Sequence, residues 1–346
     1  MSSNSRANVV LKNIKDVADK AGVSVKTVSR ALSDKNKVAQ KTRDRIYQIM
    51  EEMEYYPSAA AQSLRGRQKG IVSVIGENLT TSPDSFEIIA GIQAACESSN
   101  NLLMIGETGG NEKSFEKLVN DFRQQRAQVI IYATKYHKEV KISQSFNSCP
   151  LILVNCFEAD LKHPTILPND KVGAFKITHE LINLGHKRIA YLTLFNDMPA
   201  TKLRLQGFLD AHKLNDIAHD SELVIEGVIK GTRDELSALP ECLDKLMNSA
   251  QPPTAIMCGN DKMAMRTYML IRRKGYKIPE DVSVIGYDDY KLISESLLPN
   301  LTTVSLPYFD MGKRAAKLAL SKSTKQEVYQ VSGEVILRDS HKSMLD

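Results

Sequence analysis

The stretch Ile14-Lys-Asp-Val-Ala-Asp-Lys-Ala-Gly-Val-Ser-Val-Lys-Thr-Val-Ser-Arg-Ala-Leu32 holds two short helical patterns on either side of Gly22. In the first pattern, apolar residues recur at the spacing of one helical face, at Ile14, Val17, Ala18 and Ala21. Glycine commonly ends a helix, and the side-chain oxygen of Ser24 can cap the helix that follows. The stretch therefore predicts two helices joined by a tight turn and packed on a small core.

The second of these helices has an apolar and a polar side. Val28 and Leu32 are expected to face the core, and a set of hydrogen-bond donors is expected to face away, namely Lys26, Ser29 and Arg30. A helix fits the major groove of DNA, where lysine and arginine meet guanine acceptors and phosphates. The pattern predicts a helix-turn-helix, and an ordinary helical hairpin with a solvated charged face is the alternative.

Positive charge is concentrated beside this hairpin. Residues 1–70 contain fourteen Lys and Arg against seven Asp and Glu, a net charge of +7, and the remaining residues carry −2 of the total charge of +5. A basic segment on a nearly neutral chain is the electrostatic footprint of a polyanion partner. The charge distribution therefore favours DNA binding over the solvated hairpin.

Two more helical segments follow. A third helix is predicted over about 40–55 by an apolar stripe at Ile46, Ile49, Met50 and Met53, and it completes a head of residues 1–57. Residues 58–69 form an alanine-rich hinge whose helix is too short to be stable alone. We expect the hinge to order against DNA and a second chain, with Leu64 as a wedge in the minor groove. A flexible linker is the alternative.

From Ile71 onward, short apolar runs alternate with amphipathic helical patterns. The expected strands cover residues 71–75, 102–105, 129–132, 151–154, 188–194, 255–258 and 282–285. The expected helices cover residues 86–97, 115–125, 172–184, 203–213 and 262–274. This alternation predicts parallel sheets covered by helices on both faces. The length of this part is too great for one doubly wound core and sufficient for two.

Polar side chains follow several of the predicted strands, at Asn78, Asn155, Asn260 and Asp288. In open parallel sheets, ligands bind beyond the carboxyl ends of the strands. Amide and carboxylate groups together with an arginine can each hold neighbouring hydroxyl groups, which predicts a sugar or polyol ligand. A helix cap or loop turn is the alternative for each residue taken alone, and Asp261 is expected to be a cap.

The chain also contains a dense, ordered set of longer motifs. In the head and hinge these are Asp16-Val17-Ala18, Ala21-Gly22-Val23-Ser24, Thr27-Val28-Ser29-Arg30, Lys41-Thr42-Arg43, Tyr56-Pro57 and Ala61-Gln62-Ser63-Leu64. Further along they are Gly185 to Ala190, Arg204 to Phe208, Gly259 to Ala264, Pro279 to Asp289 and Leu301 to Val304. Together they resemble the lactose-repressor/galactose-repressor (LacI/GalR) family of transcriptional regulators over essentially the whole chain. The resemblance implies an all-α helix-turn-helix head and an α/β body of two doubly wound parallel-sheet lobes of the periplasmic-binding-protein type.

The resemblance also implies roles in the head. It assigns phosphate contacts to Ser24 and Thr27, base contacts to Val25, Lys26 and Arg30, and the intercalating position of the hinge to Leu64. Relatives usually begin the third helix with a serine cap, but this chain has Ala39 there, which predicts a loss of about 1 kcal/mol of capping. Val25 lies angularly near Val28, so core packing is the alternative to its base contact.

For the body, the resemblance implies a pocket. It assigns effector contacts to Arg204, Asn260 and Asp288, further pocket positions to Asn155 and Tyr308, and nearby positions to Asn78 or Asp84. The run from Val154 to Phe157 is more similar to repressors of sucrose and raffinose operons, which implies a sucrose-like oligosaccharide or its hexose product as effector. Phe157, Phe195 and Tyr308 are candidate stacking faces for a sugar ring, with core packing as the alternative.

Enzyme motifs are absent from the sequence: it has no complete phosphate loop, no paired-histidine metal motif and no Gly-x-Ser-x-Gly turn. We therefore expect no catalytic residue, no cofactor and no metal site. Five cysteines without zinc or redox spacing predict reduced thiols in a cytoplasmic protein. The polar start, Met1 to Asn8, does not resemble a signal peptide, and no apolar run is long enough to span a bilayer. A periplasmic carrier and a membrane protein are thus not expected.

These features predict a sequence-specific transcriptional regulator, a repressor of a carbohydrate-utilisation operon controlled by a small sugar. A pseudo-palindromic operator with half-sites about one helical turn apart needs two heads, which predicts a homodimer and leaves a tetramer open. The effector-binding and dimerisation domain is expected over 70–346, with an N-lobe at about 70–167 and 302–330 and a C-lobe at about 168–301 and 331–346. An effector-independent DNA-bending or nucleoid protein and a DNA-tethered carbohydrate enzyme are the alternatives.

Overall fold

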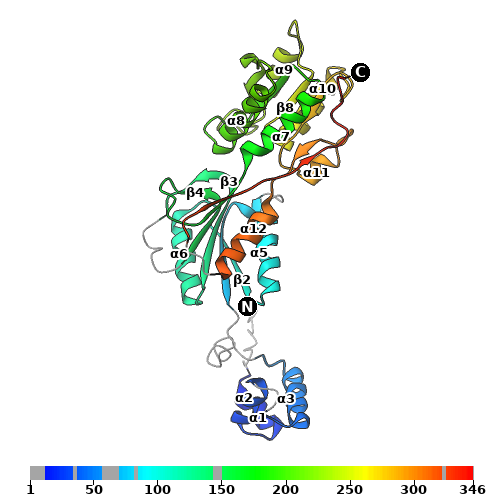
Figure 1. The fold of residues 1–346 in the computed structure, drawn as a ribbon. Helices are drawn as coiled ribbons and strands as arrows, with labels where there is room; N and C mark the ends of the chain where they lie inside the picture. Colours follow the sequence, from blue (N-terminus) through cyan, green and yellow to red (C-terminus); the bar gives the residue numbers. More distant parts are fainter. Residues whose placement is uncertain are drawn as a thin grey trace, which may run out of the picture. The chain divides into compact units, whose positions relative to one another are not determined.

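The computed structural model of the chain describes residues 12–33, 37–56, 70–81, 85–142, 150–321 and 325–345. The chain divides into two compact units, Met1–Lys69 and Gly70–Asp346, which we call the head and the body (Figure 1). The predicted hinge wedge, Leu64, and the predicted pocket residue Asp84 lie outside the described residues.

The head contains three helices, α1 (Ile14–Ala21), α2 (Val25–Ser33) and α3 (Gln40–Glu52). Gly22 ends α1 in the left-handed conformation at φ 63°, and the Ser24 Oγ accepts a hydrogen bond from the Thr27 backbone N–H at 3.1 Å. The predicted helix end and cap are thus confirmed. The core consists of buried side chains from all three helices: Val17, Ala18, Ala21, Val28, Ala31, Ile46, Ile49 and Met50.

The third helix begins without a side-chain cap, as the alanine at position 39 predicts. It ends at Glu52, three residues earlier than expected, and Glu54 takes a left-handed φ of 50°. An ion pair of 2.9 Å between the Lys20 Nζ and the Glu52 carboxylate joins α1 to the end of α3. Since both side chains are about half exposed, this pair contributes little to the free energy of unfolding.

The first lobe of the body is a six-stranded parallel sheet in the order β11-β5-β4-β3-β1-β2. Its strands are β1 (Ile71–Glu77), β2 (Leu102–Glu107), β3 (Val129–Glu139), β4 (Leu151–Phe157), β5 (Thr165–Pro168) and β11 (Val328–Val331). Helices α5 (Phe86–Ser98) and α12 (Tyr308–Leu320) cover one face, and α6 (Glu112–Gln124) covers the other. A short 3-10 helix, η1 (Leu79–Thr81), follows β1.

The second lobe has a four-stranded parallel sheet in the order β7-β6-β8-β9. Its strands are β6 (Ile189–Thr193), β7 (Val224–Glu226), β8 (Ala255–Cys258) and β9 (Ser283–Ile285). Helices α7 (Asp170–Asn183) and α8 (Pro199–Leu214) pack on one face, and α9 (Leu239–Met247) and α10 (Asp261–Arg273) on the other. Four short elements also belong to this lobe: η3 (Ser221–Leu223), α11 (Lys291–Ser294), and the antiparallel strands β10 (Thr303–Val304) and β12 (Val335–Ile336).

The chain passes between the two sheets at three places: after β5, before α12 and after β11. Every strand and helix expected in the body is present, and the predicted doubly wound architecture is confirmed. The sequence pattern did not reveal the short strands β5, β7 and β11 or the helices α9 and α12. Two of these unpredicted elements, β11 and α12, belong to the first lobe although most of the second lobe precedes them in the chain.

Helices α5 and α12 approach each other through two glycines. A Cβ atom placed on Gly91 would lie 2.0 Å from the Phe309 carbonyl oxygen, and one on Gly312 would lie 2.0 Å from the Ile88 carbonyl oxygen. Backbone atoms cannot give way as a flexible side chain can. The close contact of these helices therefore depends on the absence of side chains at both positions.

We expect Gly91→Ala to lower the free energy of unfolding by about 1–3 kcal/mol, because the cost of overpacking exceeds the gain of about 1 kcal/mol in helix propensity. Urea unfolding followed by circular dichroism measures the change. Gln93→Ala, on the exposed side of the same helix, is the control and is expected to shift stability by less than about 0.5 kcal/mol. A Gly91→Ala protein as stable as the parent would contradict the close packing.

Candidate functional site

In the head, the exposed side of α2 carries the residues predicted to contact DNA. Ser24, Lys26 and Arg30 are exposed, and Thr27 and Ser29 are half-buried. The side chain of Val25 is 41% exposed, which excludes the alternative that it belongs to the core. The Ser24 and Thr27 hydroxyl groups lie 2.9 Å apart at the start of the helix. The helix therefore presents hydroxyl, ammonium and guanidinium donors together on one surface.

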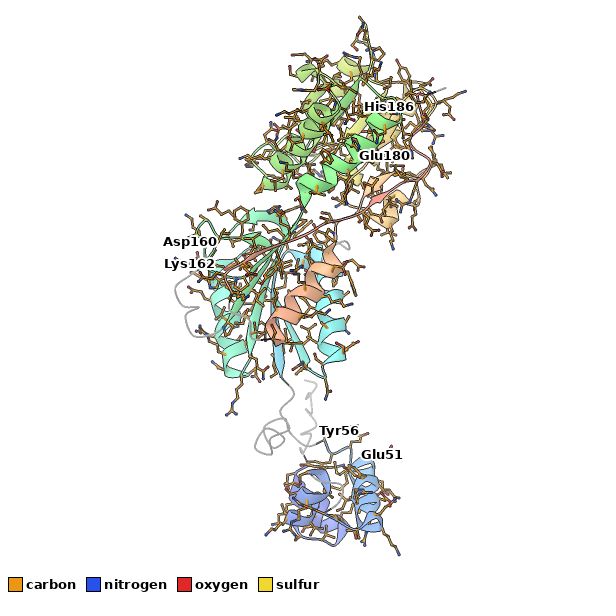
Figure 2. All side chains as sticks on the ribbon, viewed as in Figure 1. Glu51, Tyr56, Asp160, Lys162, Glu180 and His186 are labelled. Atoms are coloured by element: carbon orange, nitrogen blue, oxygen red, sulfur yellow. The ribbon has the colours of Figure 1, made fainter. Side chains whose placement is uncertain are left out.

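Figure 2 shows how side chains are distributed over both units. In the head, the labelled residue Glu51 lies near the end of α3, and Tyr56 follows that helix. Both are distant in sequence from the residues of α2. The surface of α2 itself contains no acidic residue. An anionic partner would therefore meet no carboxylate from this helix.

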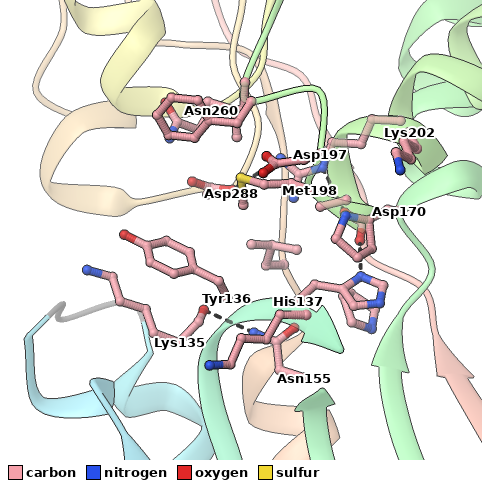
Figure 3. Close-up of a pocket in the computed structure, with 18 of the residues that line it drawn as sticks. Lys135, Tyr136, His137, Asn155, Asp170, Asp197, Met198, Lys202, Asn260 and Asp288 are labelled. Atoms are coloured by element: carbon pink, nitrogen blue, oxygen red, sulfur yellow. Dashed lines mark hydrogen bonds and ion pairs between the residues drawn. The ribbon is translucent and has the colours of Figure 1, made fainter. Parts of the chain in front are cut away.

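In the body, a cavity of about 870 Å³ lies between the carboxyl-terminal ends of the strands of the two lobes. Figure 3 shows Lys135, Tyr136, His137 and Asn155 on one wall, facing Asn260, Asp288, Asp197 and Met198 on the other. Of the predicted effector residues, the lining includes Arg204, Asn260, Asp288, Asn155 and Tyr308. The ligand site predicted beyond the carboxyl ends of the strands thus coincides with this cavity.

Arg204 is held rigidly in this cavity. Its Nε donates to the Asp170 Oδ1 at 2.7 Å, and its Nη1 donates to the Gly259 carbonyl oxygen at 2.7 Å. The guanidinium carbon lies 3.7 Å from the centre of the Tyr287 ring, and the Asp288 Oδ1 is 3.8 Å from Nη1. A buried, fixed guanidinium beside a carboxylate is well suited to hold a pair of hydroxyl groups.

Asn155 contributes from the opposite lobe, at the end of β4. It is almost completely buried and takes a left-handed φ of 58°. Its Nδ2 donates to the Thr134 and Lys135 carbonyl oxygens, both at 3.0 Å, whereas its Oδ1 has no hydrogen-bond partner among the described residues. A buried acceptor without a donor is costly, so a rearrangement of this wall that brought a hydroxyl donor to the oxygen would be favoured.

Asn260 and Asp261, which follow β8, have roles that differ from the predicted ones. Asn260 is the N-cap of α10, since its Oδ1 accepts from the Met263 backbone N–H at 2.8 Å, and it also lines the cavity. Asp261 is not the cap that was expected. Its buried carboxylate accepts hydrogen bonds from the Thr303 hydroxyl group at 2.6 Å and the Tyr290 backbone N–H at 2.7 Å, and so ties α10 to two neighbouring segments.

Other predicted positions lie differently with respect to the cavity. Tyr308 lines it at the start of α12. Asn78 is not among the lining residues; its backbone N–H donates to the Glu107 Oε1 at 2.7 Å at a left-handed φ of 58°. Phe157 and Phe195 line the cavity, and the Phe157 and His137 rings pack in a T-shaped arrangement at a centroid distance of 5.7 Å. The functional role of each of these residues stays a prediction.

The structure adds residues that the sequence pattern did not single out. Tyr136 lines the cavity with a side chain that is 55% exposed, and Asp170 and His137 lie buried beside Arg204. Asp170 follows β5, whose apolar run of Ile166 and Leu167 is too short to indicate a strand, so the rule that placed the other polar residues missed it. His137 and Tyr136 lie on an irregular extension of β3 that no periodic pattern indicates.

The titratable side chains of the body bear on the chemistry of the cavity. Where the chain is described, no three His, Cys, Asp or Glu side chains are grouped so that they could hold a metal ion. Burial raises the pKa of the Cys156 and Cys258 thiols to about 12, so both stay protonated at neutral pH. What the cavity does offer is a charged and polar corner and several aromatic side chains.

Comparisons with known proteins agree with this geometry. The model of bacterial regulatory proteins of the lacI family matches residues 13–58, and that of the periplasmic binding protein-like domain matches residues 178–341. The transcriptional repressor CytR of Escherichia coli is 30% identical over 338 residues, 96% of each chain. The chain belongs to the lacI family of bacterial regulatory proteins. As a member of this family it is a DNA-binding transcriptional repressor.

Two more relatives extend the comparison of this lacI-family chain. The sucrose operon repressor of Shigella flexneri is 30% identical over 310 residues, covering 88% of this chain and 92% of that protein. The crystal structure of the lac repressor dimer bound to operator and the anti-inducer ONPF has a TM-score of 0.77 at 23% identity, covering 96% and 99% of the two chains. The similarity to the lac repressor structure confirms the predicted fold class. No described helix combines the length and apolar character needed to cross a membrane.

The buried carboxyl of Asp261 makes the stability of this regulator depend on pH. Burial raises its pKa to about 6, above the ordinary value of 3.8, so the folded protein holds an extra proton between about pH 4 and pH 6. The free energy of unfolding should therefore gain a contribution that is complete below about pH 4 and is lost as pH rises through 6. The slope for one full proton is about 1.4 kcal/mol per pH unit.

We expect Asp261→Asn to remove this contribution, so that its free energy of unfolding declines less steeply than that of the parent between pH 4 and pH 6. Urea unfolding at several pH values in that range measures the slope. The exposed carboxylate of Asp281, changed to Asn, serves as the control. Equal slopes for parent and Asp261→Asn would show that this carboxyl keeps its ordinary pKa.

Proposed function

We propose that this repressor binds a pseudo-palindromic operator as a homodimer and releases or engages it in response to a small carbohydrate in the cavity. The observation that carries the proposal is the polar corner of the cavity. There a fixed guanidinium, a carboxylate and two amide side chains converge from both lobes, at Arg204, Asp288, Asn155 and Asn260. Such groups recognise adjacent hydroxyl groups, which are the defining chemistry of sugars.

The DNA-binding part of the proposal rests on α2. Lys26 and Arg30 are the long basic side chains on its exposed side, and they would reach base edges or phosphates in the major groove. Ser24 and Thr27 would hold a phosphate near the helix start, with Val25 against a thymine methyl group and Ser29 as a further donor. Leu64 would act as the wedge that opens the minor groove.

The sugar class follows from the chain and its relatives together. One relative is named a sucrose operon repressor and another a ribose operon repressor. The cavity volume of about 870 Å³ accommodates an oligosaccharide as well as a hexose. We therefore propose a sucrose-like oligosaccharide or its hexose product as effector, with Tyr136 as a ring-stacking surface beside the polar corner.

The homodimer is supported by exposed apolar side chains on the second lobe. Met269 on α10, Leu292 on α11 and Leu298 after α11 are each more than half exposed. Large apolar side chains left exposed on one lobe favour a partner surface. A homodimer would also supply the two heads that a pseudo-palindrome needs. Because its partner is chromosomal DNA, we place the protein in the cytoplasm, and we propose that it has no enzymatic activity.

Arg30→Ala is expected to weaken binding to the selected operator at least tenfold, while binding to unrelated DNA changes much less, because a base contact carries about 1–3 kcal/mol of discrimination. Operator sequences are first selected from a random DNA pool with the full chain, and affinities are then measured by fluorescence anisotropy at fixed salt. Arg45→Ala on α3 is the matched control for lost charge. An equal loss on both DNAs would reduce Arg30 to a phosphate contact.

The effector is tested by thermal unfolding of the full chain with sucrose, raffinose, D-glucose and D-fructose. A ligand at 100 times its dissociation constant adds about 2.7 kcal/mol of stability. We expect one of these sugars to raise the Tm of the parent and to change operator affinity, and Asp288→Ala to abolish both effects. Asp234→Asn, outside the cavity lining, is the control. Operator binding that ignores all four sugars would favour an effector-independent DNA-bending protein.

A further inference from the structure

We infer that His137 is a positioning residue that links the guanidinium of Arg204 to the first lobe through the carboxylate of Asp170. The inference rests on the proposed function, since it assigns to this chain of contacts the task of passing the effect of a bound sugar from the second lobe to the first. Neither His137 nor Asp170 belongs to the set of residues predicted to contact the effector.

The contact chain is continuous. The His137 Nδ1 lies 3.1 Å from the Asp170 Oδ2, and the other carboxylate oxygen, Oδ1, accepts from the Arg204 Nε at 2.7 Å. The Tyr287 hydroxyl group donates to the Asp170 carbonyl oxygen at 3.3 Å, and its ring stacks on the guanidinium. The two carboxylate oxygens of one side chain are thus divided between residues of different lobes.

The three residues of this contact chain, His137, Asp170 and Arg204, come from three different segments of the protein. His137 lies on β3 of the six-stranded sheet, Asp170 is the first residue of α7 directly after the crossing from β5, and Arg204 lies on α8. Asp170 therefore occupies one of the three places where the backbone passes between the lobes. A shift of one lobe relative to the other would change the His137 to Asp170 distance before it changed packing inside either lobe.

Burial makes the contacts strong. The side chains of His137, Asp170 and Arg204 are all at most 5% exposed. Burial opposes ionisation of Asp170, but Arg204 and His137 outweigh it and hold the pKa of this carboxyl below its ordinary value. A buried charge that loses one of its partners is left uncompensated, which is costly in a protein interior. The position of His137 is therefore energetically tied to that of Arg204, although the two residues do not touch.

The position of His137 has its own support. The pairing of β3 with β4 shifts register between Ala133 and Lys138, and the irregular segment 134–137 supplies Lys135, Tyr136 and His137 to the cavity wall. Asn155 holds the base of this segment through its two hydrogen bonds to carbonyl oxygens. A sugar bound at Asn155 and Arg204 would therefore act on both ends of the contact chain. The head precedes this lobe in the chain, so the first lobe is the one through which DNA binding would be affected.

A double-mutant cycle tests the link without any sugar. His137→Leu and Arg204→Lys are made singly and together in the full chain, and urea unfolding gives the equilibrium constants. Each single substitution changes the unfolding equilibrium constant by some factor. We expect the factor measured for the double variant to differ at least threefold from the product of the two single factors. Tyr136→Phe combined with Arg204→Lys is the control pair, and the factor for this double variant should equal the product of its two single factors. The same equality for the His137 pair would overturn the inference.

The regulatory consequence is tested with sucrose as the probe. Operator affinity is measured with and without saturating sucrose for the parent, His137→Leu and His137→Gln, and sucrose binding is measured by calorimetry. At sucrose concentrations that calorimetry shows to be saturating for each protein, we expect the sucrose-dependent change in operator affinity to be at least tenfold smaller in His137→Leu than in the parent. His137→Gln, which can still donate to Asp170, is expected to keep most of the change. Full coupling in His137→Leu would overturn the regulatory part. A parent that ignores sucrose would instead count against the proposed effector, and the cycle would still decide whether the link exists.

Discussion

The carboxylate of Asp170 is the interaction around which the cavity is organised. A fully buried carboxylate is unfavourable unless its charge is neutralised and its oxygens are hydrogen-bonded. Here both conditions are met by side chains from different lobes, at 2.7 Å on one side and 3.1 Å on the other. The same guanidinium that neutralises Asp170 faces the cavity and Asp288. The cavity wall and the connection between the lobes therefore share one charged group.

The head is stabilised differently, because it has only a small core. Its core is a small set of apolar side chains, so α1 and α2 depend on their caps and on the tight turn at Gly22 as well as on apolar burial. The N-cap hydroxyl of Ser24 fixes the start of α2 and so determines which residues of that helix are exposed. One side of α2 is thereby committed to the core and the other to a partner. This division lets a very small module present a basic surface without losing its fold.

Local patterns predicted much of this architecture. The helices of the head followed from a 3.6-residue stripe, a left-handed glycine and a capping serine, and each long buried strand followed from an unbroken apolar run. Strand β5 was missed because its apolar run is only Ile166 and Leu167 before Pro168, and β11 because Gln330 interrupts its apolar residues. Arg204 and the polar residues at strand ends were found from motifs and position. His137 and Asp170 were not, because their importance arises only when segments far apart in the chain meet, and no periodicity encodes such a meeting.

The irregular segment of β3 has an evolutionary consequence. Lys135 and Tyr136 stand outside the regular ladder of β3 and β4, and the backbone beneath them is held by the side chain of Asn155 rather than by strand pairing. Substitutions at these two positions can therefore alter the cavity wall while leaving the hydrogen bonds of the sheet intact. A descendant of this chain could acquire a preference for a new molecule there through few genetic changes, as long as the asparagine beneath is retained.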